Sequence, residues 1–352
     1  MRLRVERRVA VPGWLPWLTP ILSLMCTLIA AALLFTALGK PPGDTLRAIF
    51  LTPLLSTQGL SELALKASPL LLIAVGLAAG FRAGVWNIGA EGQLIMGAIA
   101  GGGVALASYG STGAWVLPAM VLAGLAGGMA WAAVPAFLRT RFGVNEILVS
   151  LMLTYVAGLF LSWLVLGPWK DPEGINFPQS RMFDDAALLP KLVEGTRLDI
   201  GILVALAVAG VASFVLRRTV TGLQIRTVGE APAAARYAGF SENGTVWATL
   251  LASGGLAGLA GVFEVAGPIG QLIPKLTPGY GFTAIVVAFL GRLQPVGIVL
   301  AAGVVALSYI GGDNAQVELG LPNAAVGLVQ ALLLFFLLAS DVLLRFRIRV
   351  RA

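Results

Sequence analysis

The sequence predicts an all-α protein that is embedded in a membrane and crosses it about ten times, with both termini cytoplasmic. Composition is the first reason. Of 352 residues, 58% are hydrophobic and only 12% are charged, against about 25% charged residues in soluble domains. The second reason is a series of long apolar segments separated by short polar ones. The third is that arginine gathers in alternate connections between those segments.

The first apolar segment, Trp17–Leu38, carries no charged residue and is long enough to cross a bilayer. It exceeds the core of a typical signal peptide and lacks a convincing small-x-small cleavage site, so we expect a retained helix. A partly amphipathic stretch, 39–66, follows and is expected outside the cytoplasm. The later apolar segments are Ala67–Gly80, Ile88–Ser108, Ala114–Leu138, Ile147–Leu166, Ile200–Leu216, Thr245–Gly267, Phe282–Leu290, Val296–Ile310 and Leu321–Leu344.

Two of these segments, Ala67–Gly80 and Phe282–Leu290, are short, and an arginine follows each of them closely. The residues that lead up to the two arginines also resemble each other, with Ala74–Arg82 similar to Ile285–Arg292. Short or glycine-broken spans in matching halves are typical of a transport path built from an internal repeat. Chance similarity between apolar segments is an equal alternative.

The distribution of arginine predicts which connections face the cytoplasm. If the N-terminus lies inside, every connection on that side has an excess of basic residues, whereas the opposite connections, such as the outer loop 167–199, hold mixed charge. The arginines of the cytoplasmic connections and tail are Arg82, Arg139, Arg141, Arg217, Arg218, Arg226, Arg236, Arg292, Arg345, Arg347, Arg349 and Arg351. An even number of spans follows.

The most informative polar segment is Phe81–Gln93, which lies between two apolar segments. Asn87 and Glu91 are four residues apart and would share one face of a helix. Asn87 could also cap the helix, with Glu91 near the positive end of its dipole. Two interpretations stay open: a helix start at the membrane interface, or a polar gate on a translocation path to which Asn87, Glu91 and Gln93 contribute.

The longest basic connection is 217–244, and it contains a predicted short helix, Glu230–Tyr237. Pro232 suits the first turn of that helix, the alanines that follow favour helix formation, and Gly239 can end it. A helix of two turns is marginal in water. It is therefore either docked on a partner protein or a solvated helix at the membrane surface.

Two further acidic residues, Glu146 and Glu264, lie at or near the ends of apolar segments. Asn145 and Glu146 open the segment Ile147–Leu166, where a carboxylate favours the helix dipole, so a structural role suffices for Glu146. Glu264 lies near the outer end of an otherwise apolar segment. An acidic residue at such a position is expected to face the interior of the helix bundle or a wet cavity.

The residue types that the chain lacks exclude several classes of function. The sequence has no histidine and a single cysteine, Cys26, which we interpret as a small packing residue. It has no Gly-x-x-x-x-Gly-Lys-[Ser/Thr] phosphate loop and no Gly-x-Ser-x-Gly nucleophile motif. No polar segment is long enough for a catalytic domain. We therefore predict that the chain carries no cofactor or metal and is not an enzyme.

The polar and glycine-rich motifs of the sequence together resemble those of a known family. They are Phe81–Gln93 (FRAGVWNIGAEGQ), Asn145–Tyr155, Thr227–Phe240, Ala252–Gly261 and Gly279–Gly297. The chain is similar to permease subunits of bacterial ABC importers, in the branched-chain amino acid/simple-sugar permease superfamily and its nucleoside (simple sugar-like) branch. The resemblance covers roughly residues 65–335. The word at Asn87–Gln93 is specific, because ribose-type permeases carry an Asp- and Ser-containing word there.

The resemblance implies a single transmembrane permease domain over 1–352, with a core at 67–344 and a coupling loop at 217–244. It also implies import of nucleosides or related simple sugars across the bacterial cytoplasmic (inner) membrane by alternating access. The residues assigned to the translocation pathway are Asn87, Glu91, Gln93, Asn145, Glu146 and Glu264. Those assigned to ATPase coupling are Gly229, Glu230, Ala234, Ala235, Arg236, Tyr237 and Gly239.

The implied partners are an ABC ATPase, a second homologous permease subunit and an extracytoplasmic substrate-binding lipoprotein. The ATPase, in this branch often one chain with two nucleotide-binding domains, would hold ATP and Mg²⁺, and no nucleic acid is involved. A rival class is an ion-coupled secondary transporter that works alone, with Glu91 or Glu264 as its titratable carboxylate. An intramembrane enzyme is a weaker rival, since the spans lack histidine and a second cysteine.

Overall fold

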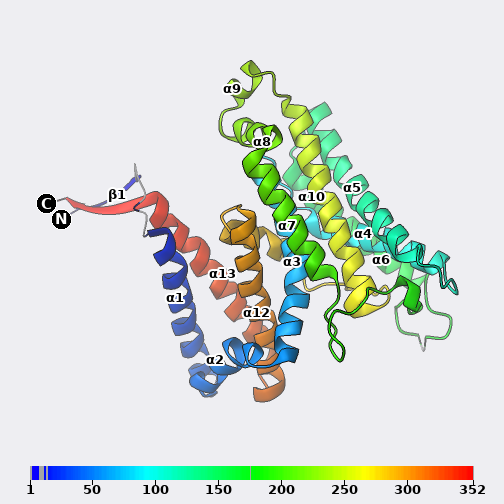
Figure 1. Cartoon of the computed structure of the whole chain (residues 1–352). Coiled ribbons are helices and arrows are strands. Elements are labelled where there is room, and N and C mark those ends of the chain that lie inside the picture. Colours follow the sequence, from blue (N-terminus) through cyan, green and yellow to red (C-terminus); the bar gives the residue numbers. More distant parts are fainter. Residues whose placement is uncertain (1, 8–11, 13–14, 175, 352) are drawn as a thin grey trace. The chain divides into compact units, whose positions relative to one another are not determined.

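The computed structural model of the protein describes residues 2–7, 12, 15–174 and 176–351, which are mostly helical (Figure 1). The chain forms two compact units. One consists of Ala64–Gly303, and the other joins Met1–Leu63 to Val304–Ala352. Helices α3 (Thr57–Arg82) and α12 (Pro295–Leu319) each continue from one unit into the other.

The smaller unit is a helical cluster made from both ends of the chain. Its other helices are α1 (Leu15–Ala37), α2 (Pro42–Phe50), the short 3₁₀ helix η1 (Thr52–Leu54) and α13 (Asn323–Arg345). Helix α1 packs along α13 and beside α2. The Ser23 hydroxyl donates to the carbonyl of Phe336 at 3.0 Å, and the Lys40 ammonium donates to the carbonyl of Leu319 at 2.6 Å. These bonds join the N-terminal helices to the last helices of the chain.

The two chain ends pair as an antiparallel ribbon, which the all-α prediction did not include. Strand β1 (Arg2–Arg7) lies against β2 (Phe346–Arg351), with Arg4 opposite Arg349. Arginine alternates with apolar residues throughout Phe346–Arg351 and from Arg2 to Val5, and a repeat of two residues is the period of a strand rather than a helix. The C-terminal arginines were used only to predict which side faces the cytoplasm, and the two strands were therefore missed.

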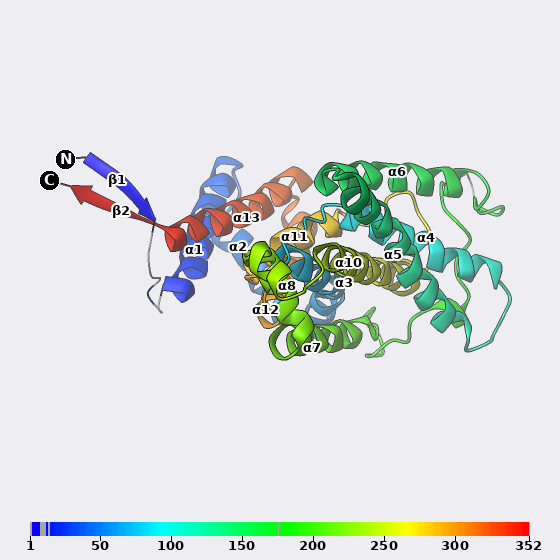
Figure 2. The same cartoon turned by 90° about the horizontal axis from the view of Figure 1, so that it is seen from above.

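The larger unit contains the helices that surround the candidate site. They are α4 (Ala90–Ala107), α5 (Val116–Phe142), α6 (Glu146–Leu166), the 3₁₀ turn η2 (Asp185–Ala187), α7 (Gly201–Arg218), α8 (Val220–Glu230), α9 (Pro232–Tyr237), α10 (Glu242–Glu264), the π-helical turn η3 (Val265–Ile269) and α11 (Tyr280–Leu290). Helix α10 packs against α4 and α5, and α4 also packs against α6. Figure 2 shows α6 and α7 on opposite flanks of α10.

Glycines allow α4, α5 and α10 to cross at backbone contact. A β-carbon at Gly258 of α10 would lie 2.2 Å from the carbonyl oxygen of Gly124 on α5. One at Gly97 of α4 would lie 2.2 Å from the α-carbon of Gly258. Helices in lipid associate through such close packing, because the hydrophobic effect between helices is absent there. Small residues at this crossing therefore determine the core of the unit.

Seven helices among the described residues are long and apolar enough to cross a membrane: α3, α4, α5, α6, α7, α10 with the turn that follows it, and α12. Each apolar segment expected from the sequence contains a helix. The expectation of a short span at Ala67–Gly80 is wrong, since α3 has 26 residues. Polar side chains such as Glu62 and Lys66 hid its first turns. Helix α11, with 11 residues, is short as expected. The total of about ten crossings stays a prediction.

Candidate functional site

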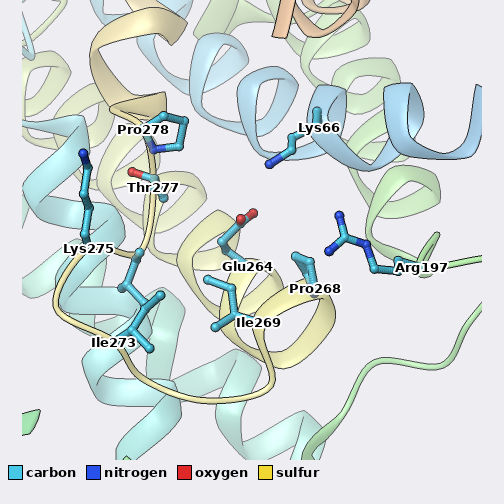
Figure 3. A pocket seen from close by; sticks show the side chains of 10 residues that line it. Lys66, Arg197, Glu264, Pro268, Ile269, Ile273, Lys275, Thr277 and Pro278 are labelled. Atoms are coloured by element: carbon cyan, nitrogen blue, oxygen red, sulfur yellow. The ribbon is translucent and has the colours of Figure 1, made fainter. Parts of the chain in front are cut away.

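A polar pocket opens at the end of α10. Its cavity volume is about 290 Å³, and Figure 3 shows side chains reaching it from α3, α10, the connection before α7 and the segment before α11. The polar lining residues are Lys66, Arg197, Glu264, Lys275 and Thr277, and the apolar ones are Pro268, Ile269, Ile273, Leu276 and Pro278. The lining of the pocket therefore carries three cationic side chains and one carboxylate.

Glu264 is the acidic member of the pocket. Its side chain is 9% exposed and ends α10, where Pro268 and the π-helical turn divert the chain. Figure 3 shows its carboxylate on the side of the pocket toward which Lys66 and Arg197 extend. Within the described part of the chain, Glu264 makes no hydrogen bond and no ion pair closer than 4.0 Å. The carboxylate thus faces the cavity, as an acidic residue in an apolar span should.

Glu91 lies behind the part of the pocket wall that Thr277 forms. Its carboxylate accepts hydrogen bonds from the Thr277 hydroxyl and, at 2.6 Å, from the N–H of Gly281. A β-carbon at Gly281 would lie 2.2 Å from the Glu91 nitrogen, so α4 and α11 begin side by side. The positive ends of two helix dipoles therefore meet at this buried carboxylate and stabilise it. Through Thr277, Glu91 fixes part of the pocket wall.

Asn87 and Gln93 are buried and bond to each other. The Asn87 amide donates to Gln93 Oε1 at 2.8 Å and to Ser253 Oγ at 2.9 Å, and the Gln93 amide donates back to Asn87 Oδ1 at 3.1 Å. Asn87 Oδ1 also accepts the N–H of Gly89 at 3.1 Å. A buried amide that loses such partners costs about 1–3 kcal/mol. These bonds hold the non-helical segment before α4 against α10, away from the pocket lining.

Asn145 and Glu146 organise the start of α6. The Asn145 side chain accepts the N–H of Ile147 at 2.9 Å, which is an N-cap. Glu146 pairs with Arg139 at the end of α5 and accepts the N–H of Trp86 at 3.2 Å. The structure therefore places neither residue in the pocket. It gives both of them local partners where α5 ends and α6 begins.

The connection between α7 and α10 forms a helical elbow, which we define as α8 and α9. Figure 1 shows the elbow beyond the ends of α7 and α10. Gly229 of α8 lies against the end of α3, where a β-carbon would be 1.9 Å from the carbonyl oxygen of Arg82. Gly239, with φ +76°, ends the elbow in a left-handed conformation. Only glycine fits the contact at Gly229.

The predicted helix Glu230–Tyr237 is wrong at its start. Glu230 is the last residue of α8, and the six-residue helix α9 begins at Pro232. Ala231 separates α8 from α9. Its φ is −146°, because a residue before proline avoids the helical region. Ala235 is 2% exposed and anchors α9, whereas Tyr237 is 96% exposed.

Other residues of the elbow are accessible too. Glu230, Ala234 and Arg236 are exposed, and Arg236 makes an exposed ion pair with Glu242 at 3.6 Å. Under the elbow, Ile225 of α8 packs with Val85 and Leu250 in an apolar cluster. The elbow is thus fixed to the helices beneath it and presents its tip to the surroundings.

Of the residues that line the pocket, only Glu264 was predicted from the sequence, and the polar ones that were missed are Lys66, Arg197, Lys275 and Thr277. Lys66 lies inside the apolar helix α3, where a lysine is expected to face a cavity or a partner, but the predicted boundary at Ala67 placed it outside the span. The ammonium of Lys66 lies 5.7 Å from the centre of the Tyr280 ring, in a cation–π contact. Arg197 and Lys275 stand in connections, and only the folded chain brings them to Glu264.

Asp199, in the connection before α7, is another residue that the sequence did not single out. Its carboxylate accepts the N–H of Gly201 at 2.7 Å, and burial raises the pKa of Asp199 to about 6. A folded-state pKa above the unfolded value of about 3.9 means that the folded protein binds the proton more tightly. The contribution of Asp199 to stability is therefore present below pH 4 and is lost as pH rises to about 6.

We expect the apparent melting temperature of the detergent-purified permease to carry a downward component between pH 4 and pH 6 that Asp199→Asn removes. The matched control is Asp185→Asn, an exposed aspartate in the same outer region. The measurement is the fraction of protein that stays soluble after heating, over a pH series. If Asp199→Asn and wild type give parallel curves, Asp199 is not the group that titrates.

Comparison with known proteins places this helical, glycine-packed chain in a family of transport proteins. Residues 59–338 match the family described as "Branched-chain amino acid transport system / permease component". The chain is 38% identical over 360 residues to the glucose ABC transporter permease protein TsgB13 of Haloferax volcanii, covering 99% of this chain and 94% of that protein.

Two Bacillus subtilis proteins are also similar. The guanosine ABC transporter permease protein NupP is 31% identical over 334 residues, covering 94% of each chain. The guanosine ABC transporter permease protein NupQ is 30% identical over 245 residues, covering 67% of this chain and 76% of that protein.

The chain therefore belongs to this family of permease components. It is a multi-pass permease subunit of the cytoplasmic (inner) membrane and a transport component rather than an enzyme. The existence of paired permeases such as NupP and NupQ implies that it works with a second permease and a separate ATPase. An ion-coupled transporter that works alone is not favoured.

Proposed function

We propose that this permease imports nucleosides or related simple sugars by alternating access, with a separate ATPase as the source of energy. Relatives named for guanosine and for glucose support this substrate class, because both compounds carry a ring sugar with several hydroxyls. The mixed donors and acceptors around Glu264 support it too, since a neutral polar molecule can satisfy both. The protein needs no covalent chemistry for this task.

A continuous series of contacts from the elbow to the pocket carries the proposal. Gly229 of the elbow lies against Arg82, and the chain leads from there through the buried amide of Asn87 into α4. Glu91 at the start of α4 holds Thr277 on the pocket wall. Movement of the elbow would therefore displace the wall, as a transporter driven from one side requires.

In this proposal the elbow docks on the ATPase. Tyr237 and Ala234 face outward and would enter a groove on that partner, the usual mode for a short helix. Glu230 and Arg236 would form the polar rim of the contact. Ala235 contributes by anchoring α9 to the permease, and the flanking glycines allow the elbow its tight shape.

The translocation path runs past Glu264 and Glu91. Asn87 and Gln93 contribute by keeping the segment before α4 non-helical, and Glu146 by holding the start of α6 against α5. Asn145 contributes by capping α6, so the six predicted residues divide into those beside the path and those that support it. Mobile walls with fixed supports suit alternating access.

The proposed topology has about ten spans and both termini in the cytoplasm. The antiparallel pairing of β1 with β2 supports an even number of crossings, because it brings the two ends of the chain together. The outer loop 167–199 would then face an extracytoplasmic substrate-binding lipoprotein. ATP and Mg²⁺ would bind only to the partner ATPase.

Uptake by a deletion strain tests the proposed function. We expect loss of this permease to reduce uptake of at least one compound, from a panel of labelled nucleosides and sugars, by more than about tenfold. A plasmid copy should restore uptake, and depletion of ATP should abolish it. Uptake that survives ATP depletion but stops with a protonophore or without sodium would instead indicate the ion-coupled class.

A further inference from the structure

We infer that the pocket around Glu264 binds the hydroxyl groups of a ring sugar, with the Glu264 carboxylate accepting from one hydroxyl while Lys66 and Lys275 donate to its neighbours. The inference rests on the proposed function and adds to it the part of the substrate that the permease itself recognises. It depends on one unusual residue. Glu264 is nine-tenths buried, and within the described residues no hydrogen-bond or ion-pair partner reaches its carboxylate.

The charges of the wall determine the chemistry of the ligand. A cation would meet Lys66 and Lys275, and an anion would meet the carboxylate of Glu264, whereas Arg197 has a partner of its own. An apolar molecule would remove water from all of these groups without replacing its hydrogen bonds, which is costly. A hydroxyl can donate and accept at once, so two adjacent hydroxyls can bridge a carboxylate and an ammonium.

The positions of the donors agree with this ligand. Figure 3 shows Lys66 and Lys275 on opposite sides of Glu264, with Thr277 between Lys275 and the carboxylate. Lys66 is further restrained by its contact with the Tyr280 ring at 5.7 Å. The donors therefore lie on two sides of the acceptor with no ion pair to it within 4.0 Å, and a ligand in the pocket could reach both.

The size of the pocket suits a small ring. A volume of about 290 Å³ corresponds to about ten water molecules at ~30 Å³ each. It lies just below the range of about 300–1,000 Å³ that is usual for small-molecule sites. A ribose or hexose ring enters such a space, and the base of a nucleoside would extend beyond it. Weak binding of this kind suits a permease, which must release its substrate.

The test measures binding to the permease complex without any substrate-binding protein, so that selection by that protein does not interfere. Saturation-transfer NMR compares guanosine with 2′,3′-dideoxyguanosine, and glucose with 2-deoxyglucose. For wild type we expect the strongest saturation on the sugar protons. At least one deoxy analogue should bind about 10–100-fold more weakly than the intact compound, because the missing hydroxyl leaves charged groups of the pocket without a hydrogen-bond partner. The two pairs of compounds separate a nucleoside ribose from a free sugar.

In Glu264→Ala we expect the intact sugar to bind about as weakly as its deoxy analogue, within about threefold. Glu264→Gln, which keeps an acceptor, should recover part of the difference. Glu194→Gln, at an exposed position of the outer loop, is the matched control and should behave as wild type. Lys275→Met removes an exposed donor with little risk to folding. It should also reduce the difference in affinity between the intact sugar and its deoxy analogue.

A deoxy penalty that is unchanged in both Glu264→Ala and Lys275→Met overturns the pocket inference. The proposed function survives that outcome if the deletion strain still fails to take up nucleosides or sugars. Conversely, normal uptake of every compound by the deletion strain overturns the proposed function. The two failures are therefore distinguishable.

Discussion

Gly258→Val is expected to remove most of the folded permease from the membrane. The new β-carbon would lie 2.2 Å from the carbonyl oxygen of Gly124 and 3.0 Å from the α-carbon of Gly128, both of them backbone atoms that cannot rotate away. Separating α10 from α5 would also open its contact with α4. We expect a destabilisation of more than about 3 kcal/mol, above the usual range for an overpacked core.

Size-exclusion chromatography of a fluorescent fusion measures this effect as the height of the monodisperse peak. Gly158→Val is the matched control, since Gly158 lies on α6 and a β-carbon there would have open space for 4 Å around it. It should give a peak close to that of wild type. An undiminished peak for Gly258→Val would show that α5 and α10 do not cross in backbone contact.

Ala234→Arg is expected to abolish ATP-driven uptake while leaving the permease folded. Ala234 is exposed on α9, so an arginine there meets no part of the permease itself. On a docked ATPase the same arginine would overfill the groove and bury an unpaired charge, at a cost of several kcal/mol. The complex should therefore dissociate, and substrate-stimulated ATP hydrolysis should fall to its basal rate.

Co-purification with the ATPase and uptake in proteoliposomes measure this change. Ala114→Arg places the same side chain at an exposed position between α4 and α5 and should leave both properties unchanged. Ala235→Arg, at the buried anchor of α9, should instead destabilise the elbow and lower the amount of folded permease. Normal uptake by Ala234→Arg would place the ATPase contact elsewhere on the chain.

The sequence was sufficient to predict the helices because apolar composition alone reports a segment that can enter lipid. It located every helix of the larger unit that has an apolar core, and it identified α11 as short. It failed where polar residues continue a helix, as in the first turns of α3 before Lys66. It also failed at Ala231, where the effect of the following proline on the backbone separates α8 from α9.

The site was predictable only in part, because a pocket forms between segments distant in sequence. Glu264 was identified from its own neighbourhood, since a carboxylate in an apolar span needs a cavity. The donors Arg197 and Lys275 stand in connections where charged residues are ordinary. Likewise, the side-chain bonds of Asn87 could not be predicted, because its partner Ser253 belongs to α10.

The central claim is that the elbow carries the force of the ATPase into the permease, and a cross-link tests it most directly. A photoreactive amino acid in place of Tyr237, which is 96% exposed, should capture the ATPase when the intact transporter is illuminated in membranes. The same probe in place of Ala114 should not. Capture of the ATPase from position 114 but not from 237 would contradict the claim.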